Sequence, residues 1–180
     1  RSIPEMLALC KERHQEQSHL KVEFRQGDIQ SLAFEPNSFD LAWSRDVFMY
    51  LQDNERGWRN IYSALKPGGY FVYVDFCKGD GDVSQEFVEY MDVCNYYLLT
   101  LEESASLLER SGFEVVKTTD ITSWIADLYR EDLLRMERDK ESFIEEFGQA
   151  DYDHLVSRWH GKIRFGQQKD LVHGLIVARK

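Results

Sequence analysis

Three acidic residues stand at or just after the ends of short apolar segments in the first half of this chain. They are Asp28, Asp46 and Asp75. The carboxyl ends of parallel strands meet at one rim of an α/β sheet, and ligands of such folds bind at that rim. A lone aspartate in this position could simply cap the following helix. Three of them in register predict instead a ligand site lined by carboxylates.

The elements that would position these aspartates alternate between strand and helix. Short apolar runs predict five strands, at residues 22–24, 39–43, 70–76, 113–118 and 171–178. The run 39–43 is apolar enough to be buried on both faces of a sheet. Helical spacing of apolar residues, with caps at Ser2, Asp53 and Thr100, predicts four helices, at residues 3–10, 54–65, 87–94 and 101–111.

Residues 122–163 are helical in character and rich in charged and aromatic side chains. This is an unusual length of helix for its place in an α/β unit, and its acidic part, 131–153, is most simply a solvated outer face. The alternation elsewhere predicts an α/β fold with a mostly parallel sheet and an antiparallel last strand.

Composition excludes several classes of partner. The chain has 180 residues and a net charge of −10, which argues against a nucleic-acid backbone or an anionic membrane. No apolar run approaches the roughly 18–20 residues of a membrane span. The three cysteines form no CxxC pair and indicate reduced thiols in a cytoplasmic protein. The five histidines show no ligand spacing, so we expect no metal.

The start of the sequence is unusual for a nucleotide-binding α/β domain. Such domains open with a strand, a glycine-rich turn and a second strand ending in an acidic residue, and none of these is present. Compared with ordinary domain sizes, this predicts a domain without its first strand–helix–strand portion, roughly 80–110 residues. Residues 1–180 would then be the C-terminal portion of one domain.

Several motifs together identify a family. The turn at residues 65–69, Leu-Lys-Pro-Gly-Gly, is common in class I S-adenosylmethionine-dependent methyltransferases. More specific are Ser-Arg-Asp at 44–46, Asp-Phe-Cys at 75–77, Glu-Tyr at 89–90, and Trp159 spaced from Lys162. With these, the chain resembles the phosphoethanolamine N-methyltransferases over essentially its whole length. The resemblance implies a Rossmann-like methyltransferase sandwich in which a helical insertion, about 122–163, covers the substrate.

The resemblance also implies roles for individual residues. Positions contacting S-adenosylmethionine are matched by Asp28, Ile29, Ser44 and Arg45. Positions lining the phosphobase pocket are matched by Asp46, Phe76, Tyr90, Tyr96 and Lys162, of which Tyr90, Tyr96 and Lys162 would hold the phosphate. Asp46 and the aromatic faces suit the cationic amine. An ion pair between Arg45 and Asp46 is disfavoured because neighbouring strand residues point to opposite faces.

The chain departs from the family at three positions. Tyr50 stands where the family has the catalytic histidine of a Tyr–His pair, Phe76 replaces a tyrosine, and Cys94 replaces a phosphate-binding arginine. Tyrosine, with an ordinary pKa of about 10, is a poor general base near neutrality. The site is therefore either tuned to already methylated substrates or part of an inactive unit of a tandem protein. We assign the catalytic positions to Tyr50 and Asp46.

The expected function is N-methylation of phosphoethanolamine or its mono- and dimethyl derivatives toward phosphocholine, by a cytoplasmic monomer. Three alternatives remain. A methyltransferase for another small acceptor would not need Lys162 and the tyrosines. A vestigial domain would bind without turnover. A binding or dimerisation module would have no affinity for the cofactor.

Overall fold

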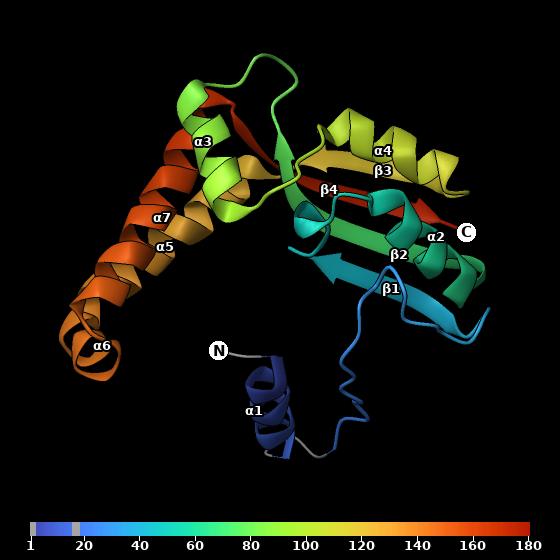
Figure 1. The fold of residues 1–180 in the computed structure, drawn as a ribbon, viewed down its shortest axis with the longest axis horizontal. Coiled ribbons are helices and arrows are strands. Elements are labelled where there is room, and N and C mark those ends of the chain that lie inside the picture. The colour runs from blue at the N-terminus through green and yellow to red at the C-terminus, as the bar shows by residue number, and fades with distance from the viewer. Residues whose placement is uncertain (1–2, 16–18) are drawn as a thin grey trace.

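The computed structural model describes residues 3–15 and 19–180. At its centre is a twisted sheet with the strand order β1-β2-β4-β3 (Figure 1). The strands are β1 (Phe39–Arg45), β2 (Leu65–Lys78), β3 (Glu114–Asp120) and β4 (Leu171–Arg179). β1 pairs in parallel with β2, whereas β4 runs antiparallel to both of its neighbours. The three earlier strands therefore share one direction, which confirms the expected parallel sheet with an antiparallel last strand.

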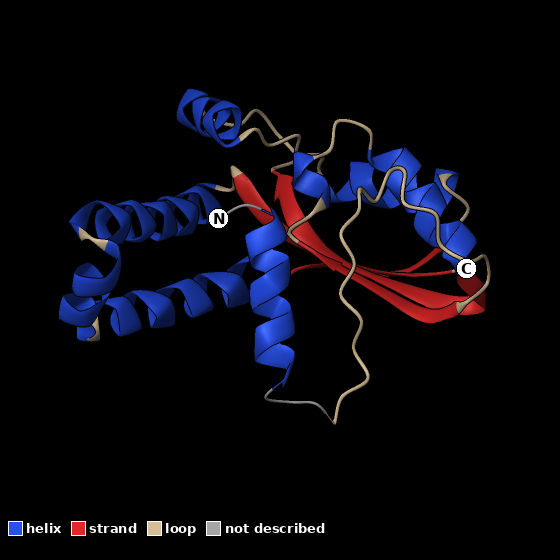
Figure 2. Ribbon diagram, turned by 60° about the horizontal axis from the view of Figure 1, so that its bottom comes forward, coloured by secondary structure: helices blue, strands red, loops and turns tan. Residues whose placement is uncertain are grey.

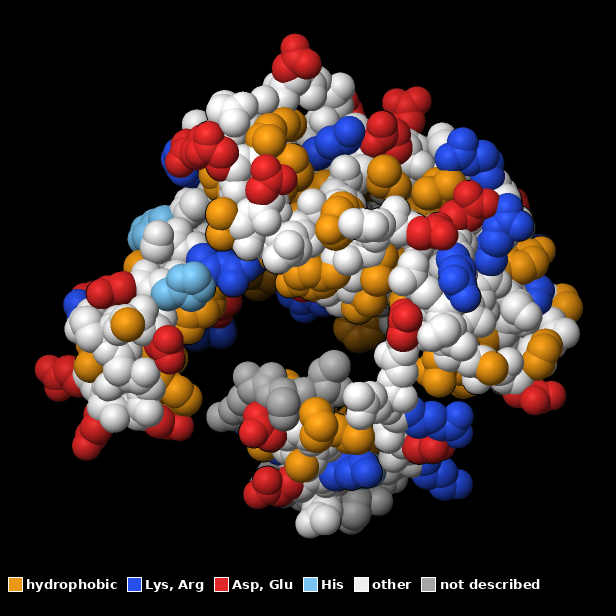
Figure 3. All heavy atoms as spheres, in the orientation of Figure 1, with side chains coloured by type: hydrophobic (Ala, Val, Ile, Leu, Met, Phe, Trp, Pro, Cys, Tyr) orange, Lys and Arg blue, Asp and Glu red, His pale blue; other side chains and the backbone are white. Residues whose placement is uncertain are grey.

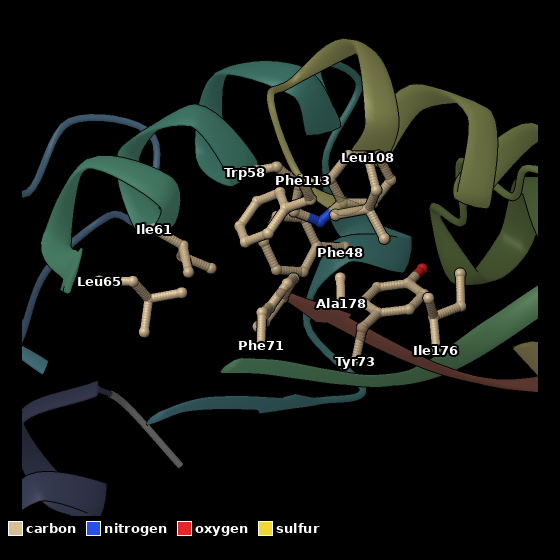
Figure 4. Packing of buried hydrophobic residues seen from close by; sticks show 10 residues of the cluster. All are labelled: Phe48, Trp58, Ile61, Leu65, Phe71, Tyr73, Leu108, Phe113, Ile176 and Ala178. Carbon is tan, nitrogen blue, oxygen red and sulfur yellow. The ribbon is translucent and has the colours of Figure 1, made fainter. Parts of the chain in front are cut away.

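Two helices cover one face of the sheet: α2 (Asn54–Ala64) and α4 (Leu101–Arg110) (Figures 1 and 2). Asp53 caps α2 by accepting from the Arg56 amide, and Thr100 forms the expected capping box with Glu103. Between these helices and the strands lies a core of ten buried side chains, from Phe48 to Ala178 (Figure 4). Trp58, Phe71 and Tyr73 surround Phe48 there, so the turn after β1 is packed firmly onto the sheet.

The region 122–163 is helical, as the sequence predicts, and the helices continue to residue 168. It forms an arm of α5 (Thr122–Arg138), α6 (Lys140–Phe147) and α7 (Gln149–Gln168). In Figures 1 and 2, α5 and α7 run side by side and extend away from the sheet. α3 (Gln85–Cys94) lies against the part of α7 nearest the sheet. No described helix is both long and apolar enough to cross a membrane.

The first part of the chain differs from expectation. α1 (Ile3–Gln15) confirms the first helix, although its proposed cap, Ser2, is outside the described residues. The strand predicted at 22–24 is wrong, because this stretch is irregular and pairs with no described strand. The prediction that residues 39–43 are buried on both faces is also wrong. β1 is an edge strand among the described residues, and Trp43 is 68% exposed.

Candidate active site

Asp46 lies at the carboxyl end of β1, where the backbone changes direction. Its φ is 55°, in the left-handed region, and its amide donates to the carbonyl oxygen of Val74 at 3.0 Å. This conformation interrupts the alternation of side chains along the strand. Asp46 Oδ2 therefore lies 3.4 Å from Arg45 Nε. Arg45 and Asp46 thus form the ion pair that strand alternation was expected to disfavour, because the positive φ of Asp46 breaks that alternation.

Asp75 is not part of the expected rim. Its side chain is fully buried, and its carboxylate accepts from the backbone amides of Val47, Phe48 and Phe76 at 2.7 to 3.1 Å. Burial raises its pKa to about 6, although the three N–H donors oppose the shift, and Asp46 adds a smaller raising effect. Asp75 thus holds the β1–η1 turn, where η1 is a 3₁₀ turn at Phe48–Tyr50. Its role is structural, and the prediction of three aspartates sharing one ligand-binding rim was wrong.

Tyr50, the last residue of this turn, belongs to a cluster of four aromatic side chains. Tyr96 is at its centre, with ring centroids 5.4 Å from Tyr50, 5.7 Å from Phe76 and 5.9 Å from Tyr90. These four residues come from η1, from the end of β2, and from α3 and the segment after it. The structure therefore brings together four of the residues that the sequence assigned to catalysis or to the substrate.

Lys162 projects from α7 onto the same cluster. Its Nζ lies 4.7 Å from the centroid of the Phe76 ring and 5.2 Å from that of Tyr129. Burial and, less strongly, the charge of Arg158 together lower its pKa to about 8, against the opposing charge of Asp46. A half-buried ammonium group with this pKa is a candidate for binding an anion.

Two further contacts hold α3 against α7. The carboxylate of Asp170, just beyond α7, accepts from the amide and hydroxyl of Ser84, the N-cap residue of α3. Farther along, Arg164 on α7 binds both carboxylate oxygens of Glu86 on α3. Between the two helices is a cleft of about 700 Å³. Tyr50, Tyr90 and Tyr96 line it from one side, and Figure 3 shows hydrophobic side chains exposed between the helical arm and the sheet.

Sequence reasoning missed four residues of this site. Arg158 and His154 line the cleft from α7, and Arg158 Nη2 donates to the Tyr96 hydroxyl at 3.2 Å. Tyr129 and His173 meet beneath Lys162, with Tyr129 Oη 3.2 Å from His173 Nε2. Burial, followed by the charge of Lys162, lowers the pKa of His173 to about 3, so this imidazole is neutral. The spacing of 154, 158 and 162 was visible in the sequence, whereas the Tyr129–His173 contact was not.

The residues expected to contact the cofactor lie on the other side of β1. Ile29, Ser44 and Arg45 line a mostly apolar cleft of about 510 Å³, together with Trp43. Asp28 precedes Ile29 on an exposed turn, where its carboxylate accepts from the Gln30 amide. The Ser44 hydroxyl oxygen is shielded from solvent and has no hydrogen-bond partner among the described residues. An apolar cleft with an unsatisfied hydroxyl in its wall fits a ligand that has both apolar faces and polar groups.

Comparisons with known proteins show what this chain is similar to. Residues 2–73 match the family described as "Methyltransferase domain". The chain is 31% identical over 175 residues to a Caenorhabditis elegans phosphoethanolamine N-methyltransferase 2, and 31% identical over 159 residues to a Triticum aestivum phosphoethanolamine N-methyltransferase. These matches cover 97% and 88% of this chain, but only 40% and 32% of the relatives.

A solved structure gives the same result. The Haemonchus contortus phosphoethanolamine N-methyltransferase 2, in complex with phosphomonomethylethanolamine and S-adenosylhomocysteine, matches with a TM-score of 0.91 and 33% identity. The match covers 97% of this chain and 41% of that one. The fold is therefore that of a class I methyltransferase, and the resemblance to phosphoethanolamine N-methyltransferases is confirmed.

Proposed function

We propose that this chain, a class I methyltransferase fold similar along nearly its whole length to phosphoethanolamine N-methyltransferases, methylates the amine of a phosphoethanolamine-type substrate. The observation that carries the proposal is the chemistry of the cleft. Cationic side chains and tyrosines line it where α3 meets α7, and the Asp46 carboxylate acts on Lys162 across the aromatic cluster. A phosphobase has the complementary arrangement, with a phosphate at one end and an amine at the other.

The assignment of parts follows from charge and aromatic character. Lys162, Tyr90 and Tyr96 would bind the phosphate, because an ammonium and phenolic hydroxyls are suitable donors to its oxygens. Asp46 and the faces of Phe76 and Tyr96 would lie against the amine and stabilise its growing methylammonium charge. In an in-line displacement, such positioning of the two reactants contributes much of the rate.

The cofactor would be S-adenosylmethionine. The Haemonchus contortus protein is known in complexes with it and with S-adenosylhomocysteine. Ile29, Ser44 and Arg45 would hold it in the apolar cleft beside β1, with Asp28 next to the adenine. When bound, it supplies an electrophilic methyl group on a sulfonium. Asp46, at the end of β1, lies between this cleft and the aromatic cluster.

Tyr50 limits the proton chemistry of the site. It is half-exposed at the end of η1, its ring contacts Tyr96, and it occupies the position of the family histidine. The neutral histidine that is nearby, His173, has a pKa of about 3 and is bonded to Tyr129, so it is a weak base. We propose that Tyr50 and Asp46 position the amine, and that the site favours already methylated phosphobases, whose cations gain more from aromatic faces.

The same proposal includes a cover for the substrate, a cellular compartment and an oligomeric state. The α5–α7 arm would cover the substrate, since α7 supplies Lys162. The three free cysteines, Cys10, Cys77 and Cys94, suit a reducing cytoplasm. A monomer suffices, because every residue proposed for the site comes from one chain.

Calorimetric titration of the complete natural protein with S-adenosylhomocysteine, and then with phosphocholine, tests the proposal. We expect both to bind, and we expect Lys162→Ala and Asp46→Ala each to weaken phosphocholine binding by roughly tenfold or more. Lys117→Ala, on the exposed surface of β3, is the matched control and should change neither affinity. Turnover is then measured with each of the three methylation states of the acceptor.

Each outcome separates the candidates. Binding of S-adenosylhomocysteine without phosphocholine would replace the phosphobase with another acceptor. Binding of both with no turnover of any acceptor would indicate a vestigial unit, which the loss of the histidine at position 50 would explain. Binding of neither would contradict the enzyme function altogether.

A further inference from the structure

Arg158 and Lys162 are one helical turn apart on α7. Arg158 lines the cleft, and Lys162 lies over the rings of Phe76 and Tyr129 beside it. Two cations at this spacing repel each other. Within the described part of the chain, neither of them forms an ion pair with a carboxylate, whereas Arg164 on the same helix pairs with Glu86. The repulsion is visible at Lys162, because the charge of Arg158 is the second cause of its lowered pKa.

The groups opposite these cations are neutral hydrogen-bonding side chains. Arg158 donates to the Tyr96 hydroxyl and lies close to Tyr90 and Cys94, which influence its pKa. The Tyr90 hydroxyl oxygen is buried and forms no hydrogen bond of standard geometry with the described residues. Two half-buried cations, one turn apart, and two tyrosine hydroxyls thus lie around the aromatic cluster, and among the described residues neither cation is paired with a carboxylate.

Other charged groups of the cleft have their own partners or lie at its margin. Glu86 is held by Arg164, and Glu89 accepts from Gln85 on its own helix. Asp46 acts on Lys162 from the β1 side, and His154 lines the cleft one turn before Arg158. α3 carries no lysine, arginine or histidine. One turn after Tyr90, where a cation on α3 could reach the two tyrosines, the residue is Cys94, which lines the cleft.

We propose that Arg158 is a specificity-determining residue, which binds the phosphate of the substrate together with Lys162 and selects a phosphomonoester over the free amino alcohol. The inference rests on the proposed function. A guanidinium offers paired donors to phosphate oxygens, while the Lys162 ammonium supplies a point charge. A phosphate dianion placed between them also relieves their mutual repulsion. α7 therefore supplies both cationic contacts.

The test is calorimetry of the complete natural protein with phosphocholine, inorganic phosphate and S-adenosylhomocysteine as separate probes. Arg158→Met should weaken binding of phosphocholine and phosphate by roughly 10- to 100-fold. S-adenosylhomocysteine affinity should be unchanged, which also shows that the variant is folded. Arg110→Met, at the exposed end of α4, is the matched control.

Two further variants separate charge from packing. Tyr96→Phe removes the hydrogen bond to Arg158 but keeps the guanidinium, so Arg158→Met should cause the larger loss. Cys94→Arg, added to Arg158→Met, places a guanidinium on α3 and should restore part of the phosphate affinity. Normal phosphate and phosphocholine binding by Arg158→Met would overturn the inference.

The inference and the proposed function can fail separately. If Lys162→Ala abolishes phosphocholine binding while Arg158→Met leaves it intact, the function stands and the role of Arg158 is wrong. If wild-type protein binds S-adenosylhomocysteine but neither phosphocholine nor phosphate, the phosphobase function itself fails.

Discussion

At the scale of single residues, the site depends on charges placed where solvent cannot fully stabilise them. Lys162 is the clearest case. Its ammonium lies over two aromatic rings, and its pKa is lowered from 10.5 to about 8. A buried charge of this kind destabilises the folded protein when no ligand is bound. Its presence is therefore better explained by a role in ligand binding than by a role in folding.

Lys162→Met should therefore stabilise the unliganded protein at pH 7. The folded pKa is below the unfolded one, so the cost is present below about pH 8 and disappears as pH rises above the unfolded value. We expect a gain of about 1–3 kcal/mol in the free energy of unfolding, after allowance for partial solvent screening.

Denaturant titrations between pH 7 and 10.5 measure this effect. At pH 7 the variant should have the larger free energy of unfolding. This advantage over the wild type should shrink as pH rises and vanish near pH 10.5. The same variant should lose phosphocholine binding. Equal destabilisation by Lys162→Met at every pH would show that the lysine has a packing role.

Asp75 gives the opposite kind of pH dependence. Its pKa is about 6 in the folded protein and 3.8 ordinarily. Because the folded pKa is above the unfolded one, the folded protein favours the protonated carboxyl. Its contribution to stability is therefore complete below the unfolded pKa and is lost as pH rises through about 6. Asp75→Asn should remove this slope between pH 4 and 6.

Asp75→Asn should also destabilise the protein at pH 7, by about 1–3 kcal/mol, because its amide group would oppose one or more of the three backbone N–H donors. Denaturation at pH 4.5 and pH 7 gives both quantities. Asp40→Asn is a suitable control, since that exposed carboxylate only pairs with Lys66 at the surface. An unchanged slope in Asp75→Asn would assign the pH dependence elsewhere.

At the scale of elements, the cleft exists because α3 and α7 are tied together at both ends of their contact. Asp170 is the main link. It is buried, its carboxylate binds Ser84 at the start of α3, and its carbonyl oxygen accepts from the Gly79 amide at the end of β2. The position of the cationic face of α7 thus depends on the turn between α7 and β4.

Gly79→Ala tests this link. A Cβ at residue 79 would lie 2.0 Å from the Lys169 carbonyl oxygen, a backbone atom that cannot move aside cheaply. We expect a loss of about 2 kcal/mol or more in stability and weaker phosphocholine binding. Gly81→Ala, two residues later in the same loop, is the control because a Cβ there meets nothing within 4 Å. Equal behaviour of the two variants would show that the turn adjusts freely.

At the scale of the whole molecule, charge is distributed unevenly. The net charge is −10, yet Arg158, which lines the cleft, and Lys162, one turn further along α7, have no carboxylate paired to either of them among the described residues. An overall negative surface does not favour capture of anions at long range. If Arg158 and Lys162 bind a phosphate as proposed, its selection comes from short, desolvated contacts, where the effective dielectric constant is low.

The amino-acid sequence by itself determined the element types and many site residues. Helical spacing, capping residues and apolar runs depend on neighbours in the chain, so α2, α4, the three later strands and the caps at Asp53 and Thr100 were predictable. The same holds for Asp46, Phe76, Tyr90, Tyr96 and Lys162, which stand in recognisable motifs. The fold gathers the three aromatic residues and Lys162 into one cluster, and Asp46 acts on Lys162 there.

Only the tertiary structure decided how distant side chains are paired and how deeply they are buried. Asp75 is a buried acceptor of three amides, and Asp46 turns toward Arg45 because of its positive φ. Arg158 meets Tyr96 across 62 positions of sequence, and Tyr129 meets His173 across 44. These contacts arise from the packing of α3, α5 and α7 around the end of the sheet, and no local pattern encodes that packing.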